Sequence, residues 1–328
     1  MNEDLERIRD LIQEDIGKRG LATNPAANLL TEAAGDFAAA CRSIAEDAQP
    51  AVAIVTGFFI LQAQLGETDG PAGALFLARA LVPLGIQVAL VADEFCVRAL
   101  EAGLEACRLD KAVPLITLPS PSQANAGNYW SEIVEQPGLQ WGNTIWTDQR
   151  EQQTASHPFL RQGQFSHLIA LERSGPNYEN RCLTMRGLDI TEHMSPAHLL
   201  FEAAAREDIT TIGIGDGGNE IGMGKISRDI IAKNIPRGEL VACRVPTNYL
   251  IVAGISNWGA YGLAAGVRLL RGQANSGELF DPEKEKQLLE IMVERGPLVD
   301  GVSGQRTATV DGIDFDRYGE KLRQLAAV

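Results

Sequence analysis

Residues 209–225 read Ile-Thr-Thr-Ile-Gly-Ile-Gly-Asp-Gly-Gly-Asn-Glu-Ile-Gly-Met-Gly-Lys, an apolar β-type run that passes directly into a glycine-rich loop. Glycine lets such a loop turn with positive φ and lets a ligand approach the backbone closely. Asp216, Asn219 and Glu220 stand among these glycines and carry oxygen atoms. A loop that only joins two elements rarely needs both features, so the stretch predicts a strand followed by a ligand-binding loop.

The rest of the chain alternates between apolar strand-like runs and helical runs. This alternation predicts an α/β fold with a mainly parallel sheet and helices on both faces. The pattern places strands at 51–56, 86–91, 113–118, 167–171, 209–214, 239–245 and 249–253. It places helices over most of 1–48 and at 71–81, 94–106, 196–207, 258–270, 282–294 and 316–326.

The alternation breaks down over residues 119–164, which are rich in Pro, Ser, Asn and Gln. We interpret this segment as a small insertion or cap embedded in the fold. The sequence shows no internal repeat or long linker, and 328 residues suit one large α/β domain. We therefore expect residues 1–328 to form a single domain.

The composition limits the partners and the compartment. A formal net charge of −14 argues against a nucleic-acid surface, whereas a few local cations can still bind a small anionic, amino-acid-like substrate. No apolar stretch reaches the ~18–20 residues of a membrane span, and the acidic N-terminus is no secretory signal. Five dispersed cysteines without a CxxC pair are typical of reduced thiols. We expect a cytoplasmic protein that contacts neither nucleic acid nor membrane. Assembly into a homo-oligomer is an open alternative.

The glycine loop matches part of a nucleotide-binding fingerprint, Gly213-x-Gly215-x-x-Gly218. Asp216 would then lie inside the phosphate-binding turn, where its charge opposes a pyrophosphate, and the next strand has no acid near its end to bind a ribose. We therefore expect no nucleotide cofactor. The oxygen atoms of Asp216 and Glu220 instead suit Mg²⁺ or Mn²⁺, although acids in such loops also cap turns locally.

Further loops after predicted strands carry charged side chains. Asp69 lies in Glu67-Thr-Asp-Gly-Pro71 and either joins a site at the carboxyl edge of the sheet or caps the following helix. Arg173 and Arg186 either clamp a carboxylate through paired hydrogen bonds or form surface ion pairs. Asp300 precedes a glycine and is interpreted either as a site residue or as part of a turn.

Seven short segments, in order along the chain, carry a resemblance to a known family. They are Thr56-Gly-Phe58, Glu67-Thr-Asp-Gly-Pro71, Glu172-Arg173, Met185-Arg-Gly187, the loop 213–225, Asn257-Trp258 and Val299-Asp-Gly301. Together they resemble the D-glutamate cyclase family, and more narrowly the C-terminal domain of its two-domain members, formerly a domain of unknown function. The resemblance runs from about Leu5 to Asp311. Residues 178–184 depart from the tyrosine- and asparagine-containing stretch expected there.

The resemblance implies an enzyme, a carbon–oxygen lyase that interconverts D-glutamate and 5-oxo-D-proline with loss or addition of water. For this reaction we assign Asp216, Glu220 and Asp69 to a Mg²⁺ or Mn²⁺ site or to acid–base duty, and Lys225 to polarising the leaving oxygen. The substrate contacts that we expect are Arg173, Arg186, Asn219, Gly217, Gly218 and Asp300. Two alternatives stay open: a Mg²⁺- or Mn²⁺-dependent phosphatase, and a non-catalytic ligand-binding module.

Overall fold

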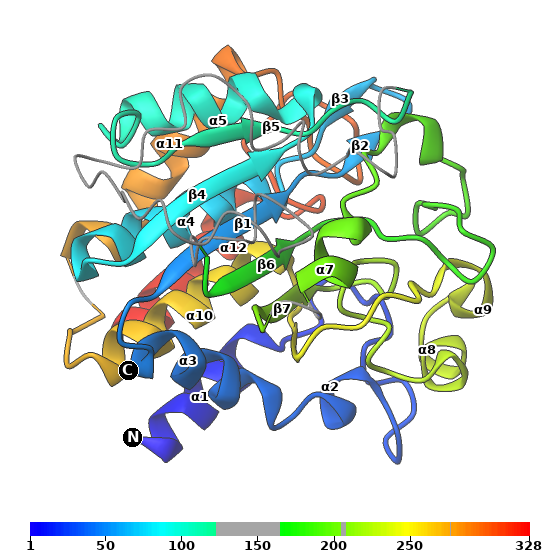
Figure 1. Ribbon diagram of the computed structural model, residues 1–328, viewed down its shortest axis with the longest axis horizontal. Coiled ribbons are helices and arrows are strands. Elements are labelled where there is room, and N and C mark those ends of the chain that lie inside the picture. The colour runs from blue at the N-terminus through cyan, green and yellow to red at the C-terminus, as the bar shows by residue number, and fades with distance from the viewer. Residues whose placement is uncertain (123–164, 205–207, 276) are drawn as a thin grey trace, which may run out of the picture.

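The computed structural model of the protein describes residues 1–122, 165–204, 208–275 and 277–328. Its centre is a six-stranded sheet in which every neighbouring pair of strands is parallel (Figure 1). The strands are β1 (Ala51–Thr56), β4 (Gln87–Ala92), β5 (Leu115–Thr117), β6 (His167–Leu171), β7 (Thr210–Gly215) and β8 (Tyr249–Val252). A short antiparallel pair, β2 (Phe59–Ile60) and β3 (Leu65–Gly66), lies in the loop that leaves β1. The predicted α/β fold with a mainly parallel sheet is confirmed.

The strand order creates a point at which the direction of the winding reverses. Across the sheet the order is β5-β4-β1-β6-β7-β8, so the chain builds outward from β1 on one side and outward from β6 on the other. Val52 pairs with His167 and Thr56 with Leu171, so β1 and β6 end side by side. In doubly wound sheets of this order, ligands bind beyond the carboxyl ends of the strands at the reversal point.

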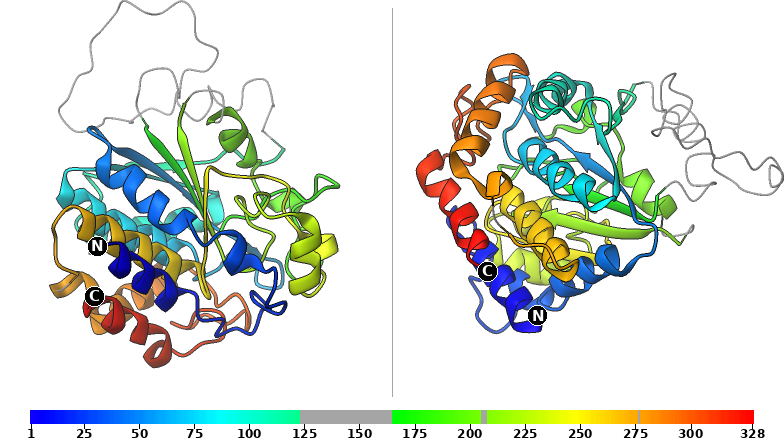
Figure 2. Two further views of the ribbon diagram at one scale, coloured as in Figure 1. Left: turned by 90° about the horizontal axis from the view of Figure 1, so that it is seen from below. Right: turned by 90° about the vertical axis from the view of Figure 1, so that its left-hand side faces the viewer.

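Helices cover both faces of the sheet, as Figure 2 shows. Alternate residues of β1 belong to two separate apolar cores, Val52 and Ile54 to one and Ala53 and Val55 to the other, as a strand buried on both faces requires. The larger core includes α1 (Asn2–Ile12), α3 (Asp36–Glu46), α4 (Pro71–Leu81), α5 (Glu94–Ala106), α10 (Ser256–Leu270), α11 (Pro282–Arg295) and α12 (Phe315–Ala326). The other core includes α2 (Leu29–Glu32), α7 (His198–Ala204) and α8 (Arg228–Asn234), with α9 (Gly238–Val241) packed on α8. Single 3₁₀ turns occur at Val82–Leu84, Thr191–His193 and Gly277–Phe280.

The helices α4 and α10 begin at the carboxyl edge of the sheet and cap one another. The first backbone N–H groups of a helix have no partner within that helix. The side chain of Asn257, in α10, accepts hydrogen bonds from the N–H groups of Gly70 (2.9 Å) and Gly73 (2.7 Å) at the start of α4. In return, Asp69 accepts from the N–H groups of Ser256 (3.0 Å) and Asn257 (2.8 Å) at the start of α10. The cap that Asp69 provides thus goes mainly to α10, not to the helix that follows it in sequence.

Two expected elements differ from the structure. The helix expected over most of residues 1–48 is interrupted at 13–28, where the carboxylate of Asp15 accepts hydrogen bonds from the N–H groups of Arg19 (2.8 Å) and Gly20 (2.9 Å) and so forms a turn. The strand expected at 239–245 is wrong, because Gly238–Val241 forms α9. A short apolar run fits one helical turn as well as a strand, and packing against α8 selects the helix.

Several expectations reach beyond what the structure describes. The cap expected at 119–164 falls almost wholly outside the described ranges. The single domain over 1–328, the homo-oligomer and the cytoplasmic location stay predictions. In the described parts of the chain, no helix is both long and apolar enough to cross a membrane.

His167, on β6, should make the stability of the fold sensitive to acid. Its side chain is buried, and burial lowers the pKa of its imidazole from 6.5 to about 4, although the charge of Asp47 opposes the shift. The unfolded chain therefore binds a proton near pH 6.5 that the folded protein binds only near pH 4. The stability that this group contributes is complete above pH 6.5 and falls as the pH drops towards 4.

Urea unfolding at pH 7 and at pH 5 should show this contribution as a loss of about 2 kcal/mol at pH 5. His167→Gln should unfold with a free energy that depends less on pH by about that amount. His193→Gln, at a partly exposed histidine, is the matched control and should keep the pH dependence of the unchanged protein. An unchanged pH dependence in His167→Gln would contradict the assignment.

Candidate active site

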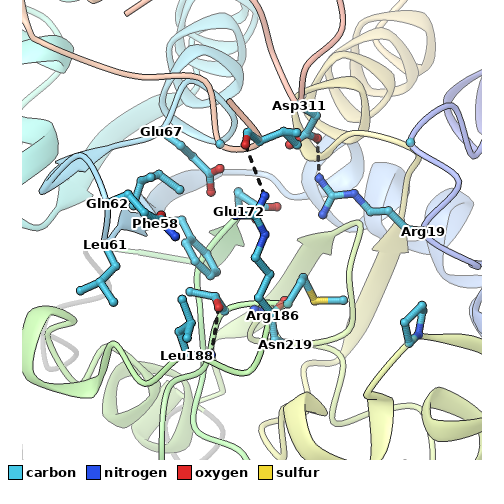
Figure 3. A pocket seen from close by; sticks show the side chains of 17 residues that line it. Arg19, Phe58, Leu61, Gln62, Glu67, Glu172, Arg186, Leu188, Asn219 and Asp311 are labelled. Carbon is cyan, nitrogen blue, oxygen red and sulfur yellow. Dashed lines mark hydrogen bonds and ion pairs between the residues drawn. The ribbon is translucent and has the colours of Figure 1, made fainter. Parts of the chain in front are cut away.

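A cavity opens at the carboxyl edge of the sheet (Figure 3). Its volume is about 290 Å³, at the small end of the range for ligand pockets. Its walls come from distant parts of the chain: the N-terminal segment 13–28, the loops after β1, β6 and β7, and the segment before α12. The polar residues that line it are Arg19, Gln62, Glu67, Glu172, Thr184, Arg186, Asn219 and Asp311.

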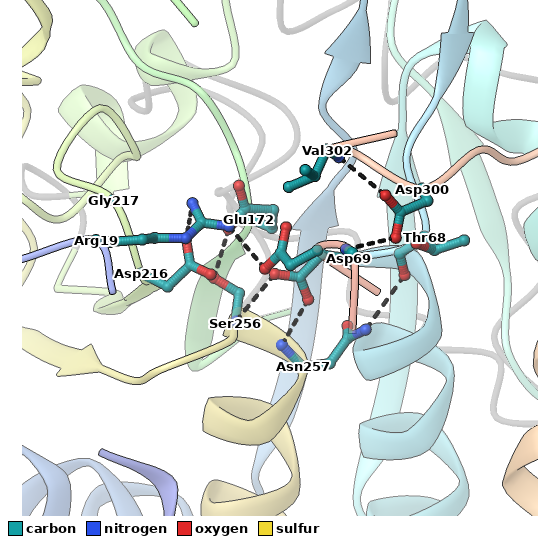
Figure 4. A network of polar contacts seen from close by, with 12 residues as sticks. Arg19, Thr68, Asp69, Glu172, Asp216, Gly217, Ser256, Asn257, Asp300 and Val302 are labelled. Carbon is teal, nitrogen blue, oxygen red and sulfur yellow. Dashed lines mark hydrogen bonds and ion pairs between the residues drawn. The ribbon is translucent and has the colours of Figure 1, made fainter. Parts of the chain in front are cut away.

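Three buried carboxylates converge beside this cavity, and one of them, Glu172, lines it. Asp69, Glu172 and Asp216 each offer one oxygen atom, and these oxygen atoms lie within 4.8 Å of one another. Each residue stands in the loop that leaves a different strand, β1, β6 or β7, so the three meet because the carboxyl ends of parallel strands meet. Figure 4 shows this group and its polar contacts. Hard oxygen ligands at this spacing can hold a divalent cation.

One guanidinium group pairs with this cluster. Arg19 Nη1 lies 2.9 Å from Asp216 Oδ1, and Arg19 Nη2 lies 2.7 Å from Asp311 Oδ2. The Arg19 side chain lines the cavity and is 19% exposed. Sequence reasoning missed this residue because it lies in the irregular segment 13–28, where the sequence pattern favours a helix. The available signal was the glycines two residues before and one after it, which weaken a helix.

Carboxylates outnumber guanidinium groups at the inner end of the cavity. Glu67 and Asp311 are buried beside the three clustered acids. Burial, and then the charge of Asp311, raises the pKa of Asp69 to about 8, although backbone hydrogen bonds oppose the shift. Burial above all, together with neighbouring carboxylates, also raises the pKa of Glu67, Glu172 and Asp216 well above their ordinary values. Such groups either retain protons at neutral pH or attract a cation.

Glu220 holds the glycine loop instead of facing the other acids. Its Oε1 accepts hydrogen bonds from the N–H groups of Asp216 (2.9 Å) and Gly217 (2.6 Å), and its Oε2 accepts one from Gly218 (2.6 Å). Gly218 has a φ of 114°, which side-chain-bearing residues rarely adopt, so the loop can curl around the carboxylate. Glu220 is therefore not one of the converging carboxylates. The N–H groups of Gly217 and Gly218 are bonded to Glu220.

Arg173 and Lys225 do not line the cavity. Arg173 is completely buried, forms an ion pair with Asp93 and donates to the carbonyl oxygen of Ser195 (2.7 Å). This arginine ties together the loops that surround the ends of β4 and β6. Lys225 Nζ lies 2.6 Å from a carboxylate oxygen of Asp36 and is partly exposed. The structure thus brings neither predicted cation to the carboxylate cluster.

Arg186 and Asn219, two predicted substrate contacts, do line the cavity. Arg186 is exposed, and its Nη2 lies 3.4 Å from the carbonyl oxygen of Val302. Asn219 is buried and donates from Nδ2 to the carbonyl oxygen of Leu183 (2.7 Å). The guanidinium of Arg186 has only the one long hydrogen bond to Val302 among the described residues.

Asp300 shapes the segment 300–312, which forms one wall of the cavity. Its carboxylate accepts hydrogen bonds from the N–H groups of Ser303 (2.7 Å) and Gly312 (2.7 Å). Burial raises the pKa of Asp300, but these hydrogen bonds lower it by more, so the pKa lies below its ordinary value. The structure therefore places Asp300 as the organiser of a segment whose Asp311 reaches the cavity.

Glu67, Glu172 and Asp311 line the cavity but are not among the predicted site residues, although Glu67 and Glu172 lie in segments that carry the family resemblance. Glu172 and Asp311 have φ values of 43° and 55°, and strain of this kind in residues other than glycine clusters at functional sites. Glu67 lies so close to Gly301 that a Cβ added there would overlap its carboxylate. These signals are properties of the folded backbone, and the sequence alone does not display them.

The fold and the cavity together define an α/β protein with a polar, carboxylate-lined site at the reversal point of a doubly wound sheet. The model of the family described as "D-glutamate cyclase-like, C-terminal" matches residues 8–326, and the chain belongs to this family. The chain is similar to "D-glutamate cyclase, mitochondrial" of Homo sapiens, with 29% identity over 290 residues that cover 80% of this chain and 42% of the relative. It thus spans about two fifths of the length of that relative. The family resemblance is confirmed.

Glu220→Gln should destabilise the protein. An amide side chain cannot accept all three hydrogen bonds that the carboxylate accepts from the glycine loop. The N–H group left without an acceptor, facing the amide NH₂, should cost about 2–4 kcal/mol of unfolding free energy, measured by urea denaturation at pH 8.

Asp216→Asn, four residues away, is the matched control. Asp216 Oδ2 is buried and accepts no hydrogen bond from the described residues, and burial raises the pKa of Asp216 well above its ordinary value although the charge of Arg19 opposes the shift. The stability linked to this proton is lost as the pH rises, so a neutral amide should leave the unfolding free energy unchanged or increased at pH 8. Equal destabilisation by the two substitutions would contradict the roles assigned to them.

Proposed function

We propose that the protein interconverts D-glutamate and 5-oxo-D-proline with loss or addition of water. The observation that carries this proposal is a cavity of about 290 Å³ whose wall holds both carboxylate and guanidinium groups, in a chain of the D-glutamate cyclase-like family. D-Glutamate bears one ammonium group and two carboxylates, so its binding requires both signs of charge. The similar human protein is much longer than this chain, and its activity is carried over here only as part of the proposal.

Arg186 is proposed to bind the α-carboxylate at the mouth of the cavity. Its exposed guanidinium has one long hydrogen bond, of 3.4 Å to Val302, and keeps donors for a ligand. Arg173, the other expected clamp, is bonded to groups in the protein interior and is not part of the proposal. The substrate ammonium is proposed to face Glu67 and Asp311, whose carboxylates line the same cavity.

A Mg²⁺ or Mn²⁺ ion is proposed to bind at Asp69, Glu172 and Asp216. These residues fit such an ion, because their oxygen atoms converge within 4.8 Å and Asp216 Oδ2 is buried without a hydrogen bond from the described residues. Glu172 takes the place expected for Glu220, since both oxygens of Glu220 hold the glycine loop. When bound, the ion would polarise a carboxyl group of the substrate and offset the negative charge of the cluster.

Cyclisation requires the substrate to fold back so that its nitrogen meets the γ-carboxyl carbon. One ammonium proton moves to the γ-carboxylate, which leaves a neutral amine and an unchanged net charge. A C–N bond then forms, a C–O bond breaks, and the oxygen leaves as water with a second proton from nitrogen. Glu67 and Asp311 are proposed to relay that proton, and holding the folded-back substrate supplies much of the rate because the reaction is intramolecular.

A metal-dependent phosphatase is the second enzymatic candidate. The glycine loop would not serve it as a phosphate-binding loop, because the N–H groups of residues 216–218 are bonded to Glu220. The excess of carboxylates also repels a dianionic phosphate. Both observations favour an amino-acid substrate over a phosphoester. A non-catalytic binding module would share the same cavity, and a turnover assay separates it from an enzyme.

Purified protein supplied with Mn²⁺ should form 5-oxoproline from D-glutamate, or D-glutamate from 5-oxo-D-proline, measured by chromatography. Asp216→Asn should lower the turnover roughly 100-fold or more, because it removes a charged oxygen from the cation cluster. Lys225→Met is the matched control and should keep turnover within about twofold, since Lys225 bonds to Asp36 away from the cavity.

Full activity in Asp216→Asn would refute the proposed site. Binding of D-glutamate without turnover would instead identify a ligand-binding module. Release of phosphate from p-nitrophenyl phosphate, without conversion of D-glutamate, would identify a phosphatase.

A further inference from the structure

We propose that Arg19 binds the γ-carboxylate of the substrate, so that the irregular N-terminal segment 13–28 completes the active site. This inference deepens the proposed function and rests on it. It assigns a substrate contact to a residue that lies far in sequence from the glycine loop and outside the segments that carry the family resemblance.

The guanidinium of Arg19 is fixed in place yet faces the cavity. Its Nη1 and Nη2 form ion pairs with Asp216 (2.9 Å) and Asp311 (2.7 Å) on two separate loops. Figure 3 shows the guanidinium beside Asp311, and Figure 4 shows it beside Asp216. A guanidinium carries five N–H donors in a rigid fork, so two ion pairs leave donors for a ligand in the cavity that Arg19 lines.

The segment that carries Arg19 is held by its own contacts. The carboxylate of Asp15 accepts hydrogen bonds from the N–H groups of Arg19 (2.8 Å), Gly20 (2.9 Å) and Leu21 (3.1 Å). Gly20 has a φ of 96°, and a Cβ added there would overlap the carbonyl oxygen of Asn234. The backbone around Arg19 is therefore ordered before a ligand binds, which lowers the entropic cost of binding.

The position of Arg19 assigns it to the γ end of the substrate. Asp216, its partner, belongs to the carboxylate cluster proposed to hold the cation, and the γ-carboxyl group is the one whose oxygen must leave. Arg186 is exposed at the mouth and is the proposed partner of the α-carboxylate. Two guanidinium groups of one cavity thus face the two carboxylates of one substrate.

Arg19 acts on the reacting group without exchanging a proton. A guanidinium stays protonated throughout, so the nitrogen protons of the substrate end on the product and on the departing water, as the atom balance of the cyclisation requires. Its N–H groups hold the γ-carboxyl oxygens and stabilise the negative charge that develops on oxygen when the C–N bond forms and before the C–O bond breaks. Arg19 is therefore a catalytic residue in the sense that it touches the reacting atoms.

The test compares two truncated ligands. 4-Aminobutyrate lacks the α-carboxylate of glutamate, and D-2-aminobutyrate lacks the γ-carboxyl group. Dissociation constants for D-glutamate and for both ligands are measured by NMR titration with Arg19→Met, Arg186→Met and the unchanged protein. Arg19→Met should weaken binding of D-glutamate and 4-aminobutyrate roughly 10–100-fold and leave D-2-aminobutyrate unchanged. Arg186→Met should show the opposite selectivity between the two truncated ligands.

Two further variants guard against a structural explanation. Lys18→Met removes the same charge from the same segment but at an exposed residue outside the cavity lining, and it should leave all three dissociation constants unchanged. Arg19→Lys keeps the positive charge but not the planar set of N–H donors. It should fold even if Arg19→Met does not, and it should show the same selectivity with a smaller loss of affinity. Equal weakening of both truncated ligands, or of neither, would overturn the role of Arg19.

The failure of this inference differs from the failure of the proposed function. If the unchanged protein converts D-glutamate but Arg19→Met lacks the selective loss, only the role of Arg19 is refuted. If the selective loss appears but the unchanged protein forms no 5-oxoproline, Arg19 is confirmed as a ligand contact and the proposed reaction is refuted. If the unchanged protein neither binds nor converts D-glutamate, both are refuted.

Discussion

The reciprocal capping of α4 and α10 is the interaction on which the rest of the site depends. Asp69 and Asn257 each satisfy the N–H groups at the start of the other's helix, so neither helix can shift without leaving buried N–H groups unpaired. Both helices therefore start beside the carboxylate cluster, and the positive ends of two helix dipoles offset part of the repulsion among Asp69, Glu172 and Asp216. A group of acids that would separate in water is held together by backbone geometry.

Acidic side chains serve two different purposes in this protein. Asp15 and Glu220 each accept hydrogen bonds from three backbone N–H groups and shape a loop, whereas Asp216 Oδ2 accepts no hydrogen bond from the described residues. The same residue types among the same glycines perform both tasks. A sequence pattern does not distinguish the two tasks. The difference is whether the folded chain places backbone N–H groups or the cavity in front of the carboxylate. Glu220 was for this reason expected in a role that the geometry offers to Glu172.

The regular elements are predictable where several local signals agree. β1, α4 and α5 begin and end at the residues that periodicity, a proline in the first helical turn and flanking loops indicate. The loops that host the site are also predictable, because they follow strands of a parallel sheet. The two arginines are not: Arg173 is buried against Asp93, and Arg19 reaches the cavity from an irregular segment. Both placements depend on contacts between distant parts of the chain, which no local pattern contains.

The walls of the cavity extend in sequence from Gly17 to Asp311. A fragment that lacks either end of this range lacks part of the wall, so the cavity forms only after long-range contacts have closed across the whole molecule, the slowest kind of contact to form. A ligand that binds there joins both ends of the chain, and its binding energy adds to the free energy of global unfolding instead of resisting the opening of one loop. Ligand binding in this cavity therefore requires that segments near both ends of the chain have folded and packed together.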